Sequence, residues 1–174
     1  APVTRLPSAR PAGSGAGSAG VSRPTDAERE AIGLVGEVVA RAWLRRRHLV
    51  VHWRSGYAAL LGSPEDAAVA SNSHGYDFEV PWRNTSLFYE VKALSGAWTR
   101  TPQEQEYEFE LGASEHHVAT AHAATTRYRV LLLTSALDPT SRRLFELPNP
   151  LSPRGRDYFR IVGHGLRLRC APGR

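Results

Sequence analysis

Three charged residues, Asp77, Glu90 and Lys92, form the pattern in this chain that is best suited to chemistry. Glu90 and Lys92 stand two positions apart in a β-rich run, so their side chains should project from the same face of a strand. Asp77 precedes Glu90 by thirteen residues, in a separate alternating segment. Two carboxylates can bind one Mg²⁺ or Mn²⁺, and an amine beside them can orient a water molecule or stabilise negative charge.

Lys92 is the single lysine in a chain that has 21 arginines. An arginine stays protonated at any accessible pH, whereas the pKa of a lysine shifts readily on burial. The choice of lysine at this one position therefore indicates an active-site amine. The alternative is that the residue is lysine by chance and that its side chain lies on a solvated strand edge.

The backbone between Glu90 and Lys92 offers a further ligand. The carbonyl of Val91 can add a hard oxygen to the carboxylates of Asp77 and Glu90 around one cation. Such a cation lowers the pKa of a bound water and steadies the charge that builds on a phosphate under in-line attack. The predicted catalytic residues are therefore Asp77, Glu90 and Lys92, and the predicted metal ligands include Asp77, Glu90 and Val91.

A helix should come first among the elements that position these residues. Thr25 stands three residues before Glu28, which is the spacing of a capping box and predicts a helix over residues 26–46. Apolar residues at helical period predict its buried face: Ile32, Val35 and Val39.

A β-hairpin is predicted after a short strand at 48–53 and a region of turn formers at 54–75. Its arms are the alternating segment 76–80 and the β-rich segment 87–94. A polar loop follows over residues 95–108. Asp77 would lie on the first arm of the hairpin, and the other two charged residues on the second.

A second helix is predicted from about residue 112 or 114 to about 126, with Val118 and Ala121 facing inward. It leads into the apolar segment 128–133, and this order predicts a crossover to a buried, parallel strand. Shorter strands are expected further along the chain, at 143–147, 158–162 and 166–170.

This arrangement resembles the PD-(D/E)XK nuclease superfamily, whose fold is called restriction-endonuclease-like. The resemblance is carried by Asp77, by Glu90-Val91-Lys92 and by the order of the predicted elements. More narrowly, residues 30–165 resemble the domain that ends NO VEIN-type proteins, through Gly36-Glu37, Phe109-Glu110-Leu111, Glu115 and the strand from Tyr128 to Leu133. The resemblance implies an α/β, restriction-endonuclease-like core, in which a mixed β-sheet is flanked by helices and the elements follow the order α-β-β-β-α-β.

Two further glutamates are considered for the site, Glu37 from the resemblance and Glu115 from its position in the second helix. A first-helix glutamate aids the metal in several nucleases of the superfamily, which would make Glu37 a fourth metal-site residue. The helical wheel instead places Glu37 away from the apolar stripe and one turn before Arg41, so an exposed ion pair is an equal alternative. Glu115, three residues after Gly112, is predicted to cap the second helix rather than to take part in catalysis.

The sequence departs from the family pattern at two positions. Tyr76 replaces the proline that names the superfamily, and Gly112 stands where related domains carry serine or threonine. Neither change removes a metal ligand.

Composition divides the chain into one domain and two tails. Residues 1–24 are almost entirely Ala, Gly, Ser, Pro and Arg, which predicts a disordered linker; residues 25–170 form the nuclease-like domain and 171–174 a short tail. No apolar stretch approaches the ~20 residues that span a bilayer, so no membrane partner is expected. The single cysteine, Cys170, fits a reducing, cytoplasmic location.

Two functions stay open from the sequence. The first is a Mg²⁺- or Mn²⁺-dependent nuclease that hydrolyses DNA, with RNA as an alternative substrate; the net charge of +5 suits a polyanion. The second is a non-catalytic module that keeps a nuclease-like fold for nucleic-acid binding or interdomain docking. The chain has no methionine, which favours a longer parent protein. The family resemblance implies that its other domains are an ATPase or helicase in a restriction or phage-defence setting.

Overall fold

The computed structural model describes residues 25–96, 107–161 and 167–170. The predicted linker at 1–24 and the predicted tail at 171–174 lie outside the described residues. So does most of the polar loop predicted at 95–108.

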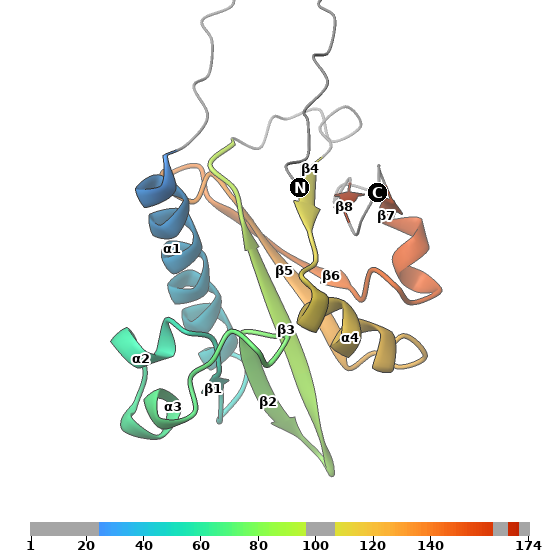
Figure 1. Ribbon diagram of the computed structural model, residues 1–174, viewed down its shortest axis with the longest axis horizontal. Coiled ribbons are helices and arrows are strands. Elements are labelled where there is room, and N and C mark those ends of the chain that lie inside the picture. Colours follow the sequence, from blue (N-terminus) through green and yellow to red (C-terminus); the bar gives the residue numbers. More distant parts are fainter. Residues whose placement is uncertain (1–24, 97–106, 162–166, 171–174) are drawn as a thin grey trace, which may run out of the picture.

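A five-stranded mixed sheet forms the centre of the structure, in the order β1-β2-β3-β5-β6 (Figure 1). Its strands are β1 (His52–Trp53), β2 (Phe78–Trp82), β3 (Thr85–Ala93), β5 (Tyr128–Thr134) and β6 (Arg143–Pro148). β3 and β5 are parallel, as predicted, and the other neighbouring pairs are antiparallel. The sheet, together with the helices beside it, confirms the α/β class; the more specific restriction-endonuclease-like fold stays a prediction.

A second, three-stranded sheet has the order β4-β8-β7. It consists of β4 (Tyr107–Glu110), β7 (Phe159–Ile161) and β8 (Arg167–Cys170). The last two strands were predicted, but β4 was not, because 107–108 had been assigned to the polar loop. β4 pairs with β8, which is far away in the sequence, so no local turn signal marks this strand.

Helix α1 (Asp26–Arg45) begins at the predicted capping box, in which Thr25 and Glu28 satisfy each other's backbone N–H groups. Its predicted buried face was wrong in part. Val35 and Val39 are only half-buried. The buried stripe is instead formed by Ile32, Gly36, Glu37, Ala40 and Leu44.

The position of α1 against the sheet depends on Gly36. A Cβ atom added there would lie 2.6 Å from the Cβ of Ala93 on β3, so only glycine permits this close approach. The tight contact brings the next residue of the helix, Glu37, to the level of the sheet.

Helices α1 and α4 (Ala113–Ala121) cover opposite faces of the sheet (Figure 1). Leu44 of α1 packs in a cluster with Tyr89, whereas Ala119 of α4 packs in another with Val130. α4 ends five residues earlier than predicted. Ala121, which was expected to face inward, is exposed, and Ala119 is the buried alanine.

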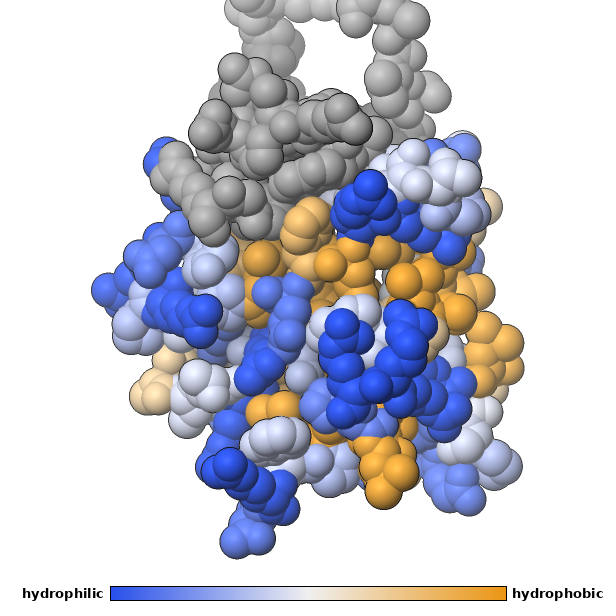
Figure 2. All heavy atoms as spheres, turned by 180° about the vertical axis from the view of Figure 1, so that it is seen from behind, coloured by the Kyte–Doolittle hydropathy of each residue, from blue (hydrophilic) through white to orange (hydrophobic). Residues whose placement is uncertain are grey.

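Three short helices complete the fold: α2 (Ala58–Leu61), α3 (Pro64–Ala68) and the 3₁₀ helix η1 (Arg154–Asp157). Seen from behind, the surface carries hydrophilic side chains across its centre and lower part, with apolar side chains between and above them (Figure 2). Among the residues that the structure describes, no helix is long and apolar enough to span a bilayer.

Candidate functional site

A notch in the central sheet brings the predicted site residues together. The pairing of β2 with β3 ends at Phe78 and Tyr89, while β3 continues to Ala93. Asp77 lies at this end: its backbone N–H donates to the Tyr89 carbonyl at 2.9 Å. Its carboxylate accepts from the Val91 N–H at 2.7 Å. The open edge of β3 beyond Tyr89 thus leaves space for side chains from both faces of the sheet.

A small cavity of about 110 Å³ opens at this end of β2. Three of the residues that line it are acidic: Asp77, Glu90 and Glu115. We refer to these three residues, with Glu37 and Lys92, as the carboxylate notch.

Glu90 and Lys92 point to the α4 side of β3, as their spacing predicted. Lys92 Nζ lies 2.8 Å from Glu90 Oε1 and 2.7 Å from Glu115 Oε2. Glu90 is 4% exposed and the side chain of Lys92 is 16% exposed. The alternative of a solvated lysine on a strand edge is therefore wrong, because the amine is largely buried between two carboxylates.

Glu37 enters the notch from the opposite face of the sheet. It is buried, and its Oε2 accepts hydrogen bonds from Ser55 Oγ and, at 2.5 Å, from Trp53 Nε1. It also lies near Asp77, close enough for its charge to act on that carboxylate. An exposed ion pair with Arg41 was the alternative from the helical wheel, and it is wrong.

Arg41 lies elsewhere. Its guanidinium is 5.0 Å from the centroid of the Trp53 ring and 3.7 Å from Asp66 Oδ2. The helical wheel misplaced Glu37 because the true buried stripe is rotated toward Gly36 and Ala40.

Glu115 caps α4 and contacts the predicted catalytic lysine. Its Oε2 accepts from the backbone N–H of Gly112 at 3.0 Å, which confirms the predicted cap, and also from Lys92 Nζ at 2.7 Å. The contact with Lys92 was not predicted. The spacing of Glu115 from Gly112 marked the start of a helix, and this says nothing about which strand the helix packs against.

The carboxylates of the notch repel one another. Burial raises the pKa of Asp77 well above its usual value, and the nearby Glu37 raises it further. The pKa of Glu90 is also raised well above its usual value, first by burial and then by the charge of Asp77. Burial raises the pKa of Glu37 as well. Negative charge is therefore in excess here, and a cation would relieve the repulsion.

Lys92 supplies the positive charge within this cluster. Burial alone would lower the pKa of its amine, but the charges of Glu90 and Glu115 outweigh that effect, so the pKa is raised. Lys92 therefore stays protonated at neutral pH and acts as a hydrogen-bond donor, not as a base.

The phenol of Tyr128 lines a larger cavity near the notch, and sequence reasoning gave it no chemical role. Tyr128 pairs with Phe88 across the parallel strands, two residues before Glu90, and the carboxylates of Glu90 and Glu115 help to raise its pKa after burial. The residue is 0% exposed. Its hydroxyl has no hydrogen-bond partner in the described part of the chain. A buried polar atom without a partner suggests that a ligand or an ordered water belongs beside it.

The notch fits a small, hard cation that needs few protein ligands. The described residues contain no group of three or more His, Cys, Asp or Glu side chains in metal-binding arrangement. Mg²⁺ is usually held by one or two carboxylates and several waters. Asp77 and Glu90 supply two carboxylates. Val91 donates its N–H to Asp77. The carbonyl of Val91 lies on the same edge of the strand, because the N–H and C=O of one strand residue point to the same side.

Comparisons with known proteins give no neighbour for this chain. No protein-family model, curated protein or solved structure matches it. Any function must therefore be argued from the geometry of the carboxylate notch.

Proposed function

We propose that this chain is a metal-dependent nuclease domain that hydrolyses phosphodiester bonds of DNA. The observation that carries the proposal is the carboxylate notch, where oxygen donors from both faces of the sheet meet one protonated amine. Oxygen donors of this kind suit Mg²⁺ or Mn²⁺, and a fixed ammonium suits the charge that develops on an attacked phosphate.

Each residue of the notch has a distinct role in this proposal. Asp77, fixed by the Val91 N–H, and Glu90 hold the cation together with the Val91 carbonyl. A bound divalent cation lowers the pKa of a water molecule and offsets the charge on the phosphate. Lys92 donates hydrogen bonds that orient this water or stabilise the oxyanion. Glu37 approaches Asp77 from the α1 side and adds negative charge beside the cation site.

The setting of the reaction belongs to the same proposal. A basic chain with a net charge of +5 favours a nucleic acid, and DNA is the substrate we propose, with RNA as the alternative. We place the domain in the cytoplasm, within a longer parent protein that carries an ATPase or helicase module.

Cleavage of supercoiled plasmid DNA by the full 174-residue chain tests the proposal. Wild type is expected to nick the plasmid with Mg²⁺ or Mn²⁺ and not with EDTA. Lys92→Ala should lower the rate by about 10²-fold or more, because it removes the fixed ammonium. Since this variant leaves Glu90 and Glu115 unpaired, Asp77→Asn provides a second, nearly isosteric variant with the same expected loss.

Arg156→Ala is the control, because it removes an exposed positive charge outside the notch and should keep full activity. Circular dichroism checks that each variant is folded. If wild type nicks no faster than the folded Asp77→Asn variant, the nuclease proposal fails. DNA binding by such an inactive wild type would then favour the non-catalytic module.

A further inference from the structure

A second charged region lies on the other face of the sheet. A groove of about 450 Å³ runs between the end of α1, the turn from β2 to β3 and the start of β5. We call it the arginine groove, and its walls include Trp43, Arg47, Trp82, Arg83, Arg127 and Arg129. Its volume lies within the range of about 300–1,000 Å³ that is common for ligand sites.

The charge of the arginine groove is almost entirely positive. Arg47, Arg83 and Arg127 are exposed, and none of them forms an ion pair with any described residue. Arg129 pairs with Glu146, the only carboxylate among the described residues that line the groove. Three guanidinium groups are thus left to bind an anionic partner.

Aromatic rings stand beside these arginines. Trp82 is a large aromatic residue that is 46% exposed. The guanidinium of Arg83 lies 6.0 Å from its ring centroid, and that of Arg47 lies 3.7 Å from the centroid of Trp43. Guanidinium groups that alternate with aromatic faces match the alternation of phosphates and bases in a nucleic-acid strand.

Arg83 occupies an unfavourable backbone conformation. It is the first of the two residues that join β2 to β3, and its φ of 54° falls in the left-handed region, where such turns favour glycine. An arginine at this position puts a guanidinium at the mouth of the groove at the expense of backbone strain. Residues held in such conformations are common at binding sites.

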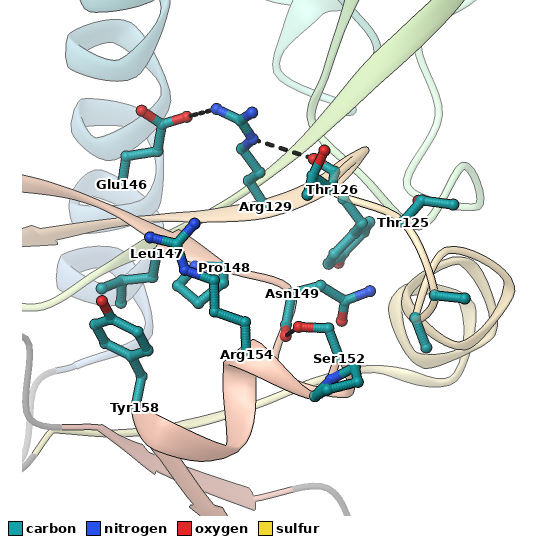
Figure 3. Close-up of a pocket in the computed structure, with 14 residues that line it drawn as sticks. Thr125, Thr126, Arg129, Glu146, Leu147, Pro148, Asn149, Ser152, Arg154 and Tyr158 are labelled. Atoms are coloured by element: carbon teal, nitrogen blue, oxygen red, sulfur yellow. Dashed lines mark hydrogen bonds and ion pairs between the residues drawn. The ribbon is translucent and has the colours of Figure 1, made fainter.

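A larger cavity nearby, of about 460 Å³, has the buried phenol of Tyr128 in its wall but, among the described residues, no tryptophan (Figure 3). Its buried amide, Asn149, donates to the Ala119 carbonyl and accepts from the Leu151 N–H, so protein groups already satisfy it. Glu146 and Arg129 face each other across its upper edge, joined by an ion pair. The arginine groove is therefore the better candidate for a second site.

We propose that the arginine groove binds a single-stranded segment of nucleic acid. Arginines alone would serve a duplex, whose bases are stacked and whose phosphates are the accessible groups. The aromatic walls contribute only if bases are unpaired and can stack on them. An acidic protein segment would pair with the arginines but would likewise leave Trp82 without a role.

This inference rests on the proposed function, because it specifies that the nucleic acid bound by the nuclease domain is single-stranded. Binding in the groove and cleavage at the notch can nevertheless be tested separately. Tyr89 lines the groove, while its neighbour Glu90 lines the notch on the opposite face of β3. Binding in the groove therefore needs neither a divalent cation nor cleavage. Measurements in EDTA report the groove alone.

Fluorescence anisotropy of the full chain with labelled single-stranded and duplex DNA of one sequence, in EDTA, tests this inference. Wild type should bind the single strand more tightly than the duplex. Trp82→Ala should weaken single-strand binding by about fivefold or more, and Trp82→Phe should restore most of it, because stacking on one base is worth that much. Arg127→Ala should reduce the slope of log K against log salt by about 0.7, the value for one lost phosphate contact.

Arg83→Gly separates binding from folding. The glycine relieves the left-handed φ, so the variant should melt at a higher temperature than wild type while binding the single strand more weakly. Arg156→Ala, an exposed arginine away from the groove, is the charge-matched control and should leave the affinity unchanged.

Tighter binding of the duplex, or an unchanged affinity in Trp82→Ala, overturns the proposal. If Arg127→Ala and Arg156→Ala weaken binding equally, the contact is a diffuse charge effect and the groove is not the site. Neither result bears on the plasmid-nicking assay, which depends on the carboxylate notch.

Discussion

The carboxylate notch and the arginine groove share strand β3 but differ in sign and in burial. Glu90 and Lys92 face α4, where Glu90 is 4% exposed. Tyr89 faces α1, and three arginines of the groove on that face, Arg47, Arg83 and Arg127, are exposed. Consecutive residues of one strand thus serve two sites of opposite charge, because side chains alternate across a sheet.

The difference in burial decides what each charge costs the fold. Carboxylates in the notch have lost water and lie close to one another, so their ionised forms destabilise the folded state. Arginines in the groove keep their hydration, and their repulsion is screened by salt. The notch therefore holds its charges only because packing forces them together, whereas the groove needs no such constraint.

Gly36 is the residue on which that packing depends most. Gly36→Ala should destabilise the protein by about 1–3 kcal/mol, because the new Cβ would overlap Ala93 on β3. The gain in helix propensity of about 1 kcal/mol only partly offsets this. As α1 moves off the sheet, Glu37 should withdraw from Asp77 and plasmid nicking should fall, while single-strand binding in the groove persists.

Gly33→Ala in the same helix is the matched control. There a new Cβ would meet only the end of the Tyr57 side chain, at 3.1 Å, and this side chain can move aside. Urea denaturation of both variants measures the difference. If the two alanine variants are equally stable, the close contact between α1 and β3 does not hold the notch together.

Much of the frame that positions the notch could be predicted from local sequence. The capping box at Thr25 marked the start of α1, and the alternation around Asp77 and Glu90 marked the hairpin. The apolar run at 128–133 marked a buried parallel strand. These signals work because caps, alternation and apolar runs depend on neighbours in the sequence.

What could not be predicted depends on contacts between distant segments. Glu37 is buried because the side chains of Trp53 and Ser55 donate hydrogen bonds to its carboxylate. Its position on the helical wheel had suggested that it faces solvent. Glu115 reaches Lys92 only because α4 packs over β3. The arginine groove likewise draws its walls from four separate segments, so no stretch of sequence marks it.

Tyr128 gives a finer comparison between the two faces. Tyr128→Phe should lower the nicking rate by roughly two- to tenfold, the value of one hydrogen bond, if its hydroxyl orders a water at the notch. Without metal, its stability should stay the same or rise, because the buried hydroxyl has no protein partner in the described structure.

Tyr89→Phe is the control on the opposite face. Its ring lies beside Arg129 on the groove face of β3, away from the notch, so this variant should keep its nicking rate. A Tyr128→Phe protein that is less stable than wild type but fully active would assign the phenol a structural role only.

The smallest expected effect is the dependence of stability on pH. Asp77 and Glu90 have raised pKa values in the folded state, so the folded protein binds more protons than the unfolded chain above about pH 4. The unfolding free energy should therefore fall as pH rises from that value through the folded-state pKa values. Lys92, whose pKa is raised, contributes stability that is lost only at strongly alkaline pH.

Asp77→Asn should flatten this decline. In EDTA the variant should match wild type near about pH 5 and exceed it by about 1 kcal/mol near about pH 8, because one buried charge is gone while the bond from the Val91 N–H remains possible. His48 and His122, whose pKa values are lowered by burial, titrate in both proteins and cancel in the difference. Mn²⁺ should stabilise wild type at the higher pH and not the variant, because the cation binds the folded, ionised notch. Equal pH profiles for the two proteins would mean that the Asp77 carboxylate is not under repulsion, and the contrast between repelling charges in the notch and hydrated charges in the groove would then be lost.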